Sequence, residues 1–156
     1  TTNQTGTGNL VLSNSPVIAS PTLTGPAIGV ATGTSLAATG LIKSSGTAGI
    51  GYATGAGGTV TQGTSRTTTV ICNAICGAIT LFSAAGSATP ASFTVTNSTV
   101  VATDTVMVNQ KSGTDKYAAI VTTVGAGSFE ITFWDLTGTT TEQPVLNFSV
   151  IKAVTS

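Results

Sequence analysis

The fold class is decided by the stretch Ser128-Phe129-Glu130-Ile131-Thr132-Phe133-Trp134-Asp135. Its large apolar side chains recur at a strict period of two, so Phe129, Ile131 and Phe133 point to one face of an extended strand. The residues between them, Trp134 among them, point to the other face. This alternation predicts a β-strand that is buried on one side.

Working outward, the same period of two appears in two other segments. Near the C-terminus, Leu146, Phe148 and Val150 share one face, and in residues 91–97 the side chains of Phe93 and Val95 do the same. Five further segments combine β-branched or aromatic residues with flanking turn residues. The predicted strands are Thr59–Gln62, Thr67–Asn73, Gly77–Phe82, Ala91–Asn97, Thr105–Gln110, Tyr117–Val124, Ser128–Asp135 and Pro144–Val154. Eight short strands at this spacing predict a β-sandwich of jelly-roll type over residues 59–156.

The composition of the 156 residues also favours an all-β protein. Thr and Val are abundant, and β-branched side chains suit a pleated sheet better than a helix. Charged residues make up only 6% of the chain, against roughly 25% in ordinary soluble domains. The net charge is zero, which removes the attraction that holds proteins to nucleic acid or to anionic membranes. No apolar run is long enough for a transmembrane helix, so neither partner is expected.

Residues 1–45 form a different region, predicted to be an extended fibrous stem. Pro16, Pro21 and Pro26 interrupt it at a spacing of five, and proline supplies no donor to a sheet interior. The short apolar groups between the prolines therefore lack partners within the chain. Two interpretations are open: a disordered linker, or a strand wound with two identical copies. The regular apolar spacing favours the homotrimeric stem, packed through Leu12, Ile18, Leu23 and Ile28.

Residues 46–58 contain six glycines in thirteen positions and are predicted to be a hinge. A phosphate-binding loop is the competing interpretation, but Gly55-Ala56-Gly57-Gly58 lacks the Lys-Ser/Thr that completes such a loop, and no helix is expected to follow. Within the hinge, Tyr52 is expected to anchor the stem to the domain. The first residues contain no signal-peptide pattern, and because residue 1 is Thr, the chain is expected to be part of a longer protein.

Few residues in the chain carry chemistry. It contains no His, which rules out a Ser-His-Asp or Cys-His arrangement. Cys72 and Cys76 alone cannot complete a four-ligand zinc site, so no metal or other cofactor is expected. The two thiols are expected to be free and mostly buried, with a local disulfide as the alternative.

The five acidic residues are not arranged as a catalytic pair. Glu130 and Asp135 share one predicted strand, but their odd spacing puts them on opposite faces. Surface solvation is the expected role of Asp104, Asp115, Glu130, Asp135 and Glu142. No enzyme activity is predicted.

Two aromatic residues are candidates for a ligand site or a subunit interface. Trp134 is the only tryptophan and alternates onto the face opposite Phe133. It could stack on a sugar ring, although the enrichment of Trp in interfaces favours subunit contact. Tyr117, which opens a strand after the loop Lys111–Lys116, is a similar case.

Two regions of the chain, the stem and the β-domain, carry a resemblance to a known family. The stem sequence Gly6-Thr7-Gly8-Asn9-Leu10-Val11-Leu12-Ser13-Asn14-Ser15-Pro16, followed by Ser20-Pro21-Thr22-Leu23, resembles a segment of bacteriophage tail fibre and tailspike proteins. The stretch from Gly51 to Gln62 and the closing Asn147–Val154 resemble a C-terminal domain of phage and prophage proteins. The resemblance implies a homotrimeric virion fibre, assembled in the bacterial cytoplasm together with other virion proteins. It implies no particular ligand residues.

The expected function is therefore that of a tail fibre or tailspike segment whose β-domain trimerises and contacts a glycan or protein on the host surface. Two alternatives stay open. The same trimer could decorate the capsid or form a head fibre, or it could be the trimerisation cap of a larger fibre.

Overall fold

The computed structural model describes residues 41, 47 and 49–153. The predicted packing residues of the stem, Leu12, Ile18, Leu23 and Ile28, lie outside this part of the chain. All the strands described below belong to the unit Ser44–Ser156. None of the described residues belongs to a helix, and accordingly none of them forms a helix long and apolar enough to span a membrane.

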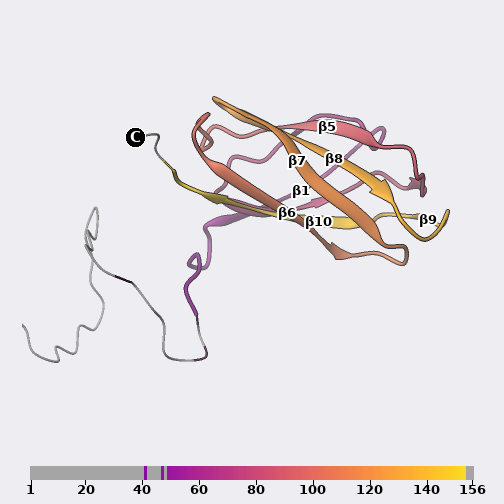
Figure 1. The fold of residues 1–156 in the computed structure, drawn as a ribbon, viewed down its shortest axis with the longest axis horizontal. Helices are drawn as coiled ribbons and strands as arrows, with labels where there is room; N and C mark the ends of the chain where they lie inside the picture. Colours follow the sequence, from indigo (N-terminus) through magenta and orange to yellow (C-terminus); the bar gives the residue numbers. More distant parts are fainter. Residues whose placement is uncertain (1–40, 42–46, 48, 154–156) are drawn as a thin grey trace, which may run out of the picture. The chain divides into compact units, whose positions relative to one another are not determined.

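The described part of the chain forms an all-β fold, as predicted (Figure 1). Its strands are β1 (Gly57–Thr61), β2 (Val70–Ile71), β3 (Cys76–Thr80), β4 (Ala84–Ala85), β5 (Ala91–Thr96), β6 (Thr105–Ser112), β7 (Tyr117–Gly125), β8 (Ser128–Asp135), β9 (Thr141–Glu142) and β10 (Val145–Ile151). Sheet A has the order β1-β3-β10-β6, and sheet B has the order β2-β5-β8-β7. A small third sheet pairs β4 with β9.

Each four-stranded sheet combines antiparallel pairs with one parallel pair at its edge. In sheet A, β1 runs parallel to β3, and in sheet B, β2 runs parallel to β5. The remaining pairs are antiparallel. The sheets thus form a sandwich-like pair of layers. The two parallel pairs differ from the antiparallel pairing of a jelly roll.

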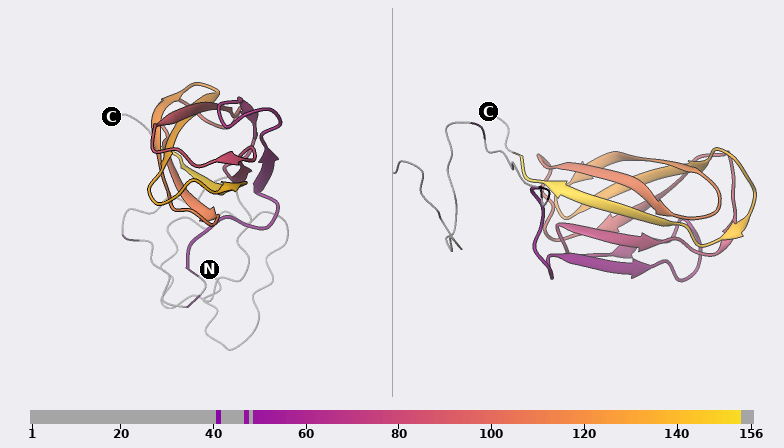
Figure 2. Two further views of the ribbon diagram at one scale, coloured as in Figure 1. Left: turned by 90° about the vertical axis from the view of Figure 1, so that its right-hand side faces the viewer. Right: turned by 90° about the horizontal axis from the view of Figure 1, so that it is seen from below.

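The two ends of this sandwich differ. Residues 49–56 lead into β1 at one end, where β10 also finishes; we call this the near end (Figures 1 and 2). The far end carries β4, β9 and the loops that precede β7 and follow β8.

The core lies between the inner faces of sheets A and B, and the alternating residues of the sequence supply it. Phe129, Ile131 and Phe133 of β8 are buried, and so are the alternating apolar residues of β5 and β10. The rings of Phe129 and Phe148 connect the two sheets, with centroids 5.2 Å apart. The face predicted for each of these strands is therefore confirmed.

The predicted strand bounds agree best with the observed ones where apolar and polar residues alternate strictly. Ser128–Asp135 is a strand over its whole predicted length, whereas the predicted Thr67–Asn73 contains only the two residues of β2. The two-residue strands β4 and β9 were not predicted. β1 begins at Gly57, so the last two residues of the predicted hinge belong to sheet A.

Surface solvation was the wrong prediction for three of the five acidic residues. Asp104, Asp115 and Asp135 are buried. Each accepts backbone N–H groups, Asp135 from Thr137 and Gly138, for example, because loops without a β-ladder need other partners for their amides. These carboxylates hold loops in place.

Candidate functional site

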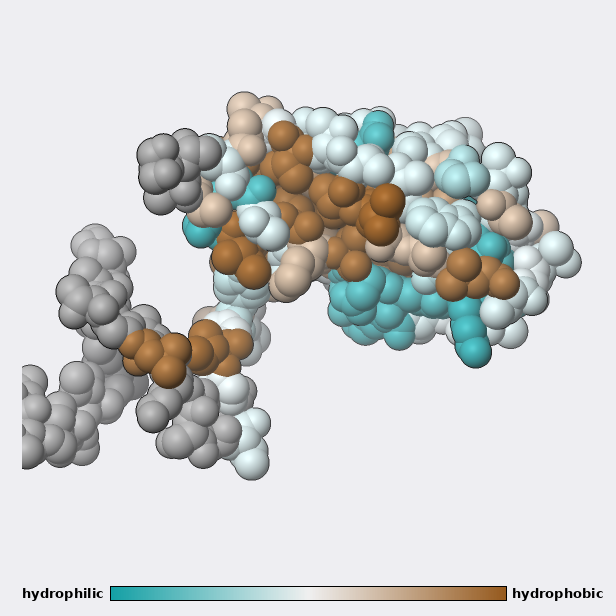
Figure 3. Space-filling view, viewed as in Figure 1, coloured by the Kyte–Doolittle hydropathy of each residue, from teal (hydrophilic) through white to brown (hydrophobic). Residues whose placement is uncertain are grey.

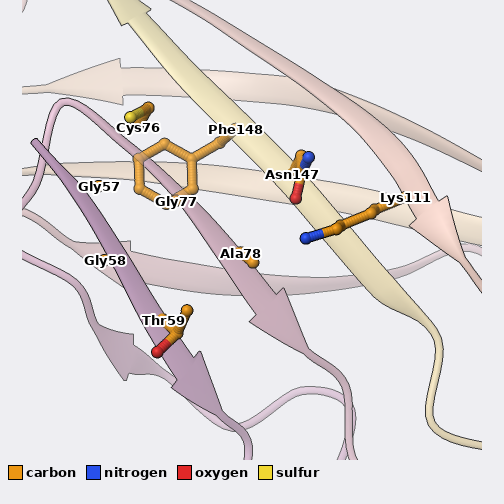
Figure 4. A pocket seen from close by; sticks show the side chains of 9 residues that line it. All are labelled: Gly57, Gly58, Thr59, Cys76, Gly77, Ala78, Lys111, Asn147 and Phe148. Carbon is orange, nitrogen blue, oxygen red and sulfur yellow. The ribbon is translucent and has the colours of Figure 1, made fainter. Parts of the chain in front are cut away.

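The outer face of sheet A carries a shallow cavity of about 410 Å³, which we call the shelf (Figure 4). It spans all four strands of the sheet. Its outward-facing residues are Gly57 and Thr59 of β1, Cys76 and Ala78 of β3, Asn147 of β10 and Lys111 of β6.

The floor of the shelf is flat because its side chains are small. Strand pairing puts Thr59 opposite Ala78 and Ala78 opposite Asn147, so these three side chains lie in one row across the sheet. Gly57, next to Cys76 in the register, adds no side chain at all. The inward-facing Gly77 leaves room for the Phe148 ring, which supports the floor from the core side.

Three polar side chains border this floor: Lys111, Asn147 and Thr59 (Figure 4). Within residues 49–153, none of them forms a side-chain hydrogen bond, and Lys111 has no ion pair. Lys152 is different, because its ammonium lies 2.6 Å from the Asp104 carboxylate. The polar groups of the shelf are thus available to a ligand.

The two thiols are free, as predicted, and they occupy different environments. Cys72 is buried beneath β1, against Gly58, whereas Cys76 is half-buried and lines the shelf. Burial, and next the nearby Cys76, raise the pKa of the Cys72 thiol. Cys72 therefore packs as a small apolar side chain.

The two aromatic candidates, Trp134 and Tyr117, are not brought together. Trp134 lies half-buried on the outer face of sheet B, opposite Ala118 of β7. Tyr117 points to the inner face and is only 6% exposed. Its hydroxyl accepts a hydrogen bond from Arg66, and its ring packs near Phe133. Tyr117 is therefore a core residue at the far end.

A smaller cavity of about 300 Å³ lies beside Tyr117, lined also by Arg66, Phe133 and Pro90. The guanidinium of Arg66 donates to the carbonyls of Phe82, Ala84, Ala85 and Glu142 and to the Tyr117 hydroxyl. All five of its N–H groups are used in this way. Arg66 thus has no donor left for a ligand, and its role is to fasten the far-end loops.

Glu142 also fastens a loop: its carboxylate accepts the amides of Thr114 and Asp115. Burial raises the pKa of this carboxyl, but its hydrogen bonds, those from the two amides foremost, together outweigh burial and hold the pKa below its ordinary value. Among the described residues, no group of three His, Cys, Asp or Glu side chains is placed to hold a metal ion.

A second surface feature, the hinge-side groove, lies at the near end. It has a volume of about 360 Å³ and is lined by Ile50, Gly51, Tyr52, Met107, Ser149 and Ile151. Ile50 is 74% exposed and Met107 is 53% exposed. The Tyr52 hydroxyl donates to the carbonyl of Val150, which fastens the segment before β1 to β10.

The sequence predicts that Lys111 begins a loop, and it gives no sign of a site there. It lies in β6 next to an irregular register between β6 and β10. No local pattern predicts that β1, β3 and β10 form one surface with it.

Comparison of the chain with protein-family models, curated proteins and solved structures finds no significant match.

Proposed function

We propose that this chain is a structural component of a bacteriophage virion: a homotrimeric tail fibre or tailspike segment with a jelly-roll-like β-domain. In this proposal the β-domain joins the trimer at its near end and contacts the host surface. The observation that carries the proposal is the hinge-side groove, where exposed apolar residues gather beside the segment that leads into β1.

Apolar side chains exposed together indicate a surface that is covered in the assembled state. Ile50, Tyr52, Met107 and Ile151 come from three separate parts of the chain and meet in one groove. Figure 3 shows further apolar surface along the side formed by β6 and β7. These two strands are the neighbouring edges of sheets A and B, so the apolar surface continues from one sheet to the other.

The sequence supports the same assembly. The stem residues Leu12, Ile18, Leu23 and Ile28 recur between prolines that prevent an ordinary sheet, and a three-stranded stem would bury them. A three-fold assembly is closed, so it satisfies every such contact without forming filaments. The low content of charged residues suits a surface that is largely covered by other subunits.

Native mass spectrometry of the purified full chain tests the trimer. The expected species has a mass of about 46 kDa, three times the 15.3 kDa of one chain. A stable monomer at micromolar concentration would contradict the proposal.

Adsorption of the fluorescently labelled trimer to a panel of bacterial cells tests host contact, and saturable binding to a subset of strains is expected. If the trimer adsorbed to none of the strains, the attachment role would be contradicted and only the role in assembly would remain.

The Trp134→Ala variant separates the two roles of Trp134. We expect weaker assembly from a subunit-interface residue, whereas normal assembly with lost adsorption would assign Trp134 to ligand contact.

A further inference from the structure

We propose that the shelf on sheet A binds a saccharide that carries a carboxylate. This inference rests on the proposed attachment function and specifies the chemical class of the host ligand. Lys111 binds the carboxylate, while Asn147 and Thr59 bind neighbouring sugar hydroxyls.

The charge distribution over sheet A selects an anion. The four strands of this sheet contain no Asp or Glu, and Lys111 is their only basic residue. No protein carboxylate neutralises the Lys111 ammonium within residues 49–153. Because the side chain extends across β10 toward β3, its charge lies over the floor of the shelf (Figure 4). An ammonium ion in this position favours a carboxylate that lies on the same floor.

The shape and the remaining polar groups select a saccharide. The cavity of about 410 Å³ is within the size range of small-ligand sites. Asn147 supplies both donors and an acceptor, and the Thr59 hydroxyl supplies one donor and two acceptor positions. Sugar hydroxyls pair with such groups, and the small side chains of Gly57 and Ala78 let a ring approach the sheet.

Nucleic acid is a poor match for the same surface. Its affinity depends on several cations that neutralise successive phosphates, and the shelf provides one. A single cation among uncharged hydrogen-bonding groups fits a sugar with one carboxylate better than a polyanion.

Calorimetric titration of the purified full chain tests the proposal. The probes are the methyl glycosides of galacturonic acid and of sialic acid, each with a single carboxylate, and the methyl ester of each, which keeps the sugar and removes the charge. We expect at least one of the two acids to bind, and its ester to bind about tenfold or more weakly. Equal affinity for acid and ester, or no binding of either acid, would overturn the proposal.

The variant Lys111→Ala is compared with Lys116→Ala, which removes the same charge from the far-end loop, where Lys116 also lacks an ion pair. We expect Lys111→Ala to weaken binding of the acid about tenfold or more and Lys116→Ala to leave it unchanged. Equal effects of the two variants would show non-specific attraction and overturn the assignment. Because both side chains are exposed, both variants should keep the thermal unfolding midpoint of the parent chain.

Cys76 provides a readout of position. It lines the shelf, whereas Cys72 is buried, so a maleimide should label Cys76 first. Saturating acid should slow this labelling several-fold, and an unchanged rate would place the ligand elsewhere.

Native mass spectrometry of the same samples separates the two proposals. A monomer that binds the acid contradicts the trimer alone, while a trimer that binds neither acid contradicts the shelf ligand alone.

Discussion

Gly77 lies at a point of β3 where the sandwich has no room for a side chain. A Cβ atom there would lie 2.7 Å from the Phe148 ring and 2.7 Å from the Gly58 carbonyl oxygen. We therefore expect Gly77→Ala to lower the free energy of unfolding by about 1–3 kcal/mol, the usual cost of overpacking. Urea unfolding measures the difference.

The matched control for this change is Gly57→Ala in the neighbouring strand. The nearest atom to a Cβ at Gly57 is the Cys76 sulfur at 3.4 Å, which is ordinary contact, so this variant should unfold at nearly the same urea concentration as the parent. If both variants lost the same stability, the close packing of Phe148 on Gly77 would not be the cause.

Arg66 is the second residue on which the far end depends. It is 9% exposed, and its guanidinium donates to four carbonyls at the far end, three of them in β4 and β9, and to Tyr117. Replacing it by Met would remove all five of these hydrogen bonds, at a cost of about 3 kcal/mol or more. Tyr117→Phe removes only one of the hydrogen bonds, so it should cost about 1 kcal/mol. Thermal or urea unfolding compares the two, and equal losses would contradict this role of Arg66.

At the scale of elements, carboxylates hold the far-end loops and the connection between β5 and β6. The side-chain hydrogen bond from Lys152 and the amide of Val101 hold the pKa of Asp104 below its ordinary value. Burial raises the pKa of Asp135, but its hydrogen bonds, those from the Thr137 and Gly138 amides foremost, together outweigh burial and hold the pKa below its ordinary value. Glu142 follows the same rule.

The folded state therefore binds fewer protons than the unfolded state in the acid range. The stability from these groups is fully present above the unfolded pKa values of about 4 and is lost as the pH falls through the lower folded values. We expect the urea midpoint to fall from about pH 5 downward. The Glu142→Gln variant should have a lower urea midpoint than the parent chain at pH 7, and its midpoint should fall less steeply as the pH is lowered. An identical pH dependence of the midpoint in both proteins would contradict the contribution of Glu142.

Tyr52 fastens the segment before β1 through one hydrogen bond to Val150. Tyr52→Phe keeps the ring and removes the hydroxyl, so we expect residues 49–56 to exchange amide hydrogens faster and to be cleaved more readily by protease. The strands should be unaffected, because no strand residue depends on that hydroxyl for its ladder. Faster exchange throughout β10 would indicate that Tyr52 supports the whole strand.

The sequence predicts best those strands that show the alternation of apolar and polar residues along their own length. Ser128–Asp135 carries its alternation in eight consecutive residues, and it is a strand from end to end. β4 and β9 have two residues each and exist through pairing with each other, which no local pattern reports. The shelf was missed for the same reason: Lys111, Asn147 and Thr59 meet only because β6, β10, β3 and β1 are neighbours in one sheet.

For the whole molecule, the arrangement of exposed apolar residues separates the proposed assembly surface from the far end. Met107, in the hinge-side groove, is 53% exposed, and Leu136, in the loop after β8 at the far end, is 60% exposed. Their similar exposure makes them a matched pair for a charge substitution. A lysine in a buried subunit interface is left without a partner, whereas a lysine on a free surface is solvated.

We therefore expect Met107→Lys to shift the trimer toward monomer by at least tenfold in the apparent dissociation constant, and Leu136→Lys to leave assembly unchanged. Because Met107 is already exposed within one chain, the substitution should not unfold the domain, and the circular dichroism spectrum of each variant checks this. Sedimentation velocity over a range of protein concentrations measures the dissociation. A trimer of unchanged stability in Met107→Lys would exclude the hinge-side groove as the contact and leave the stem as the source of assembly, since the stem residues are untouched by either change.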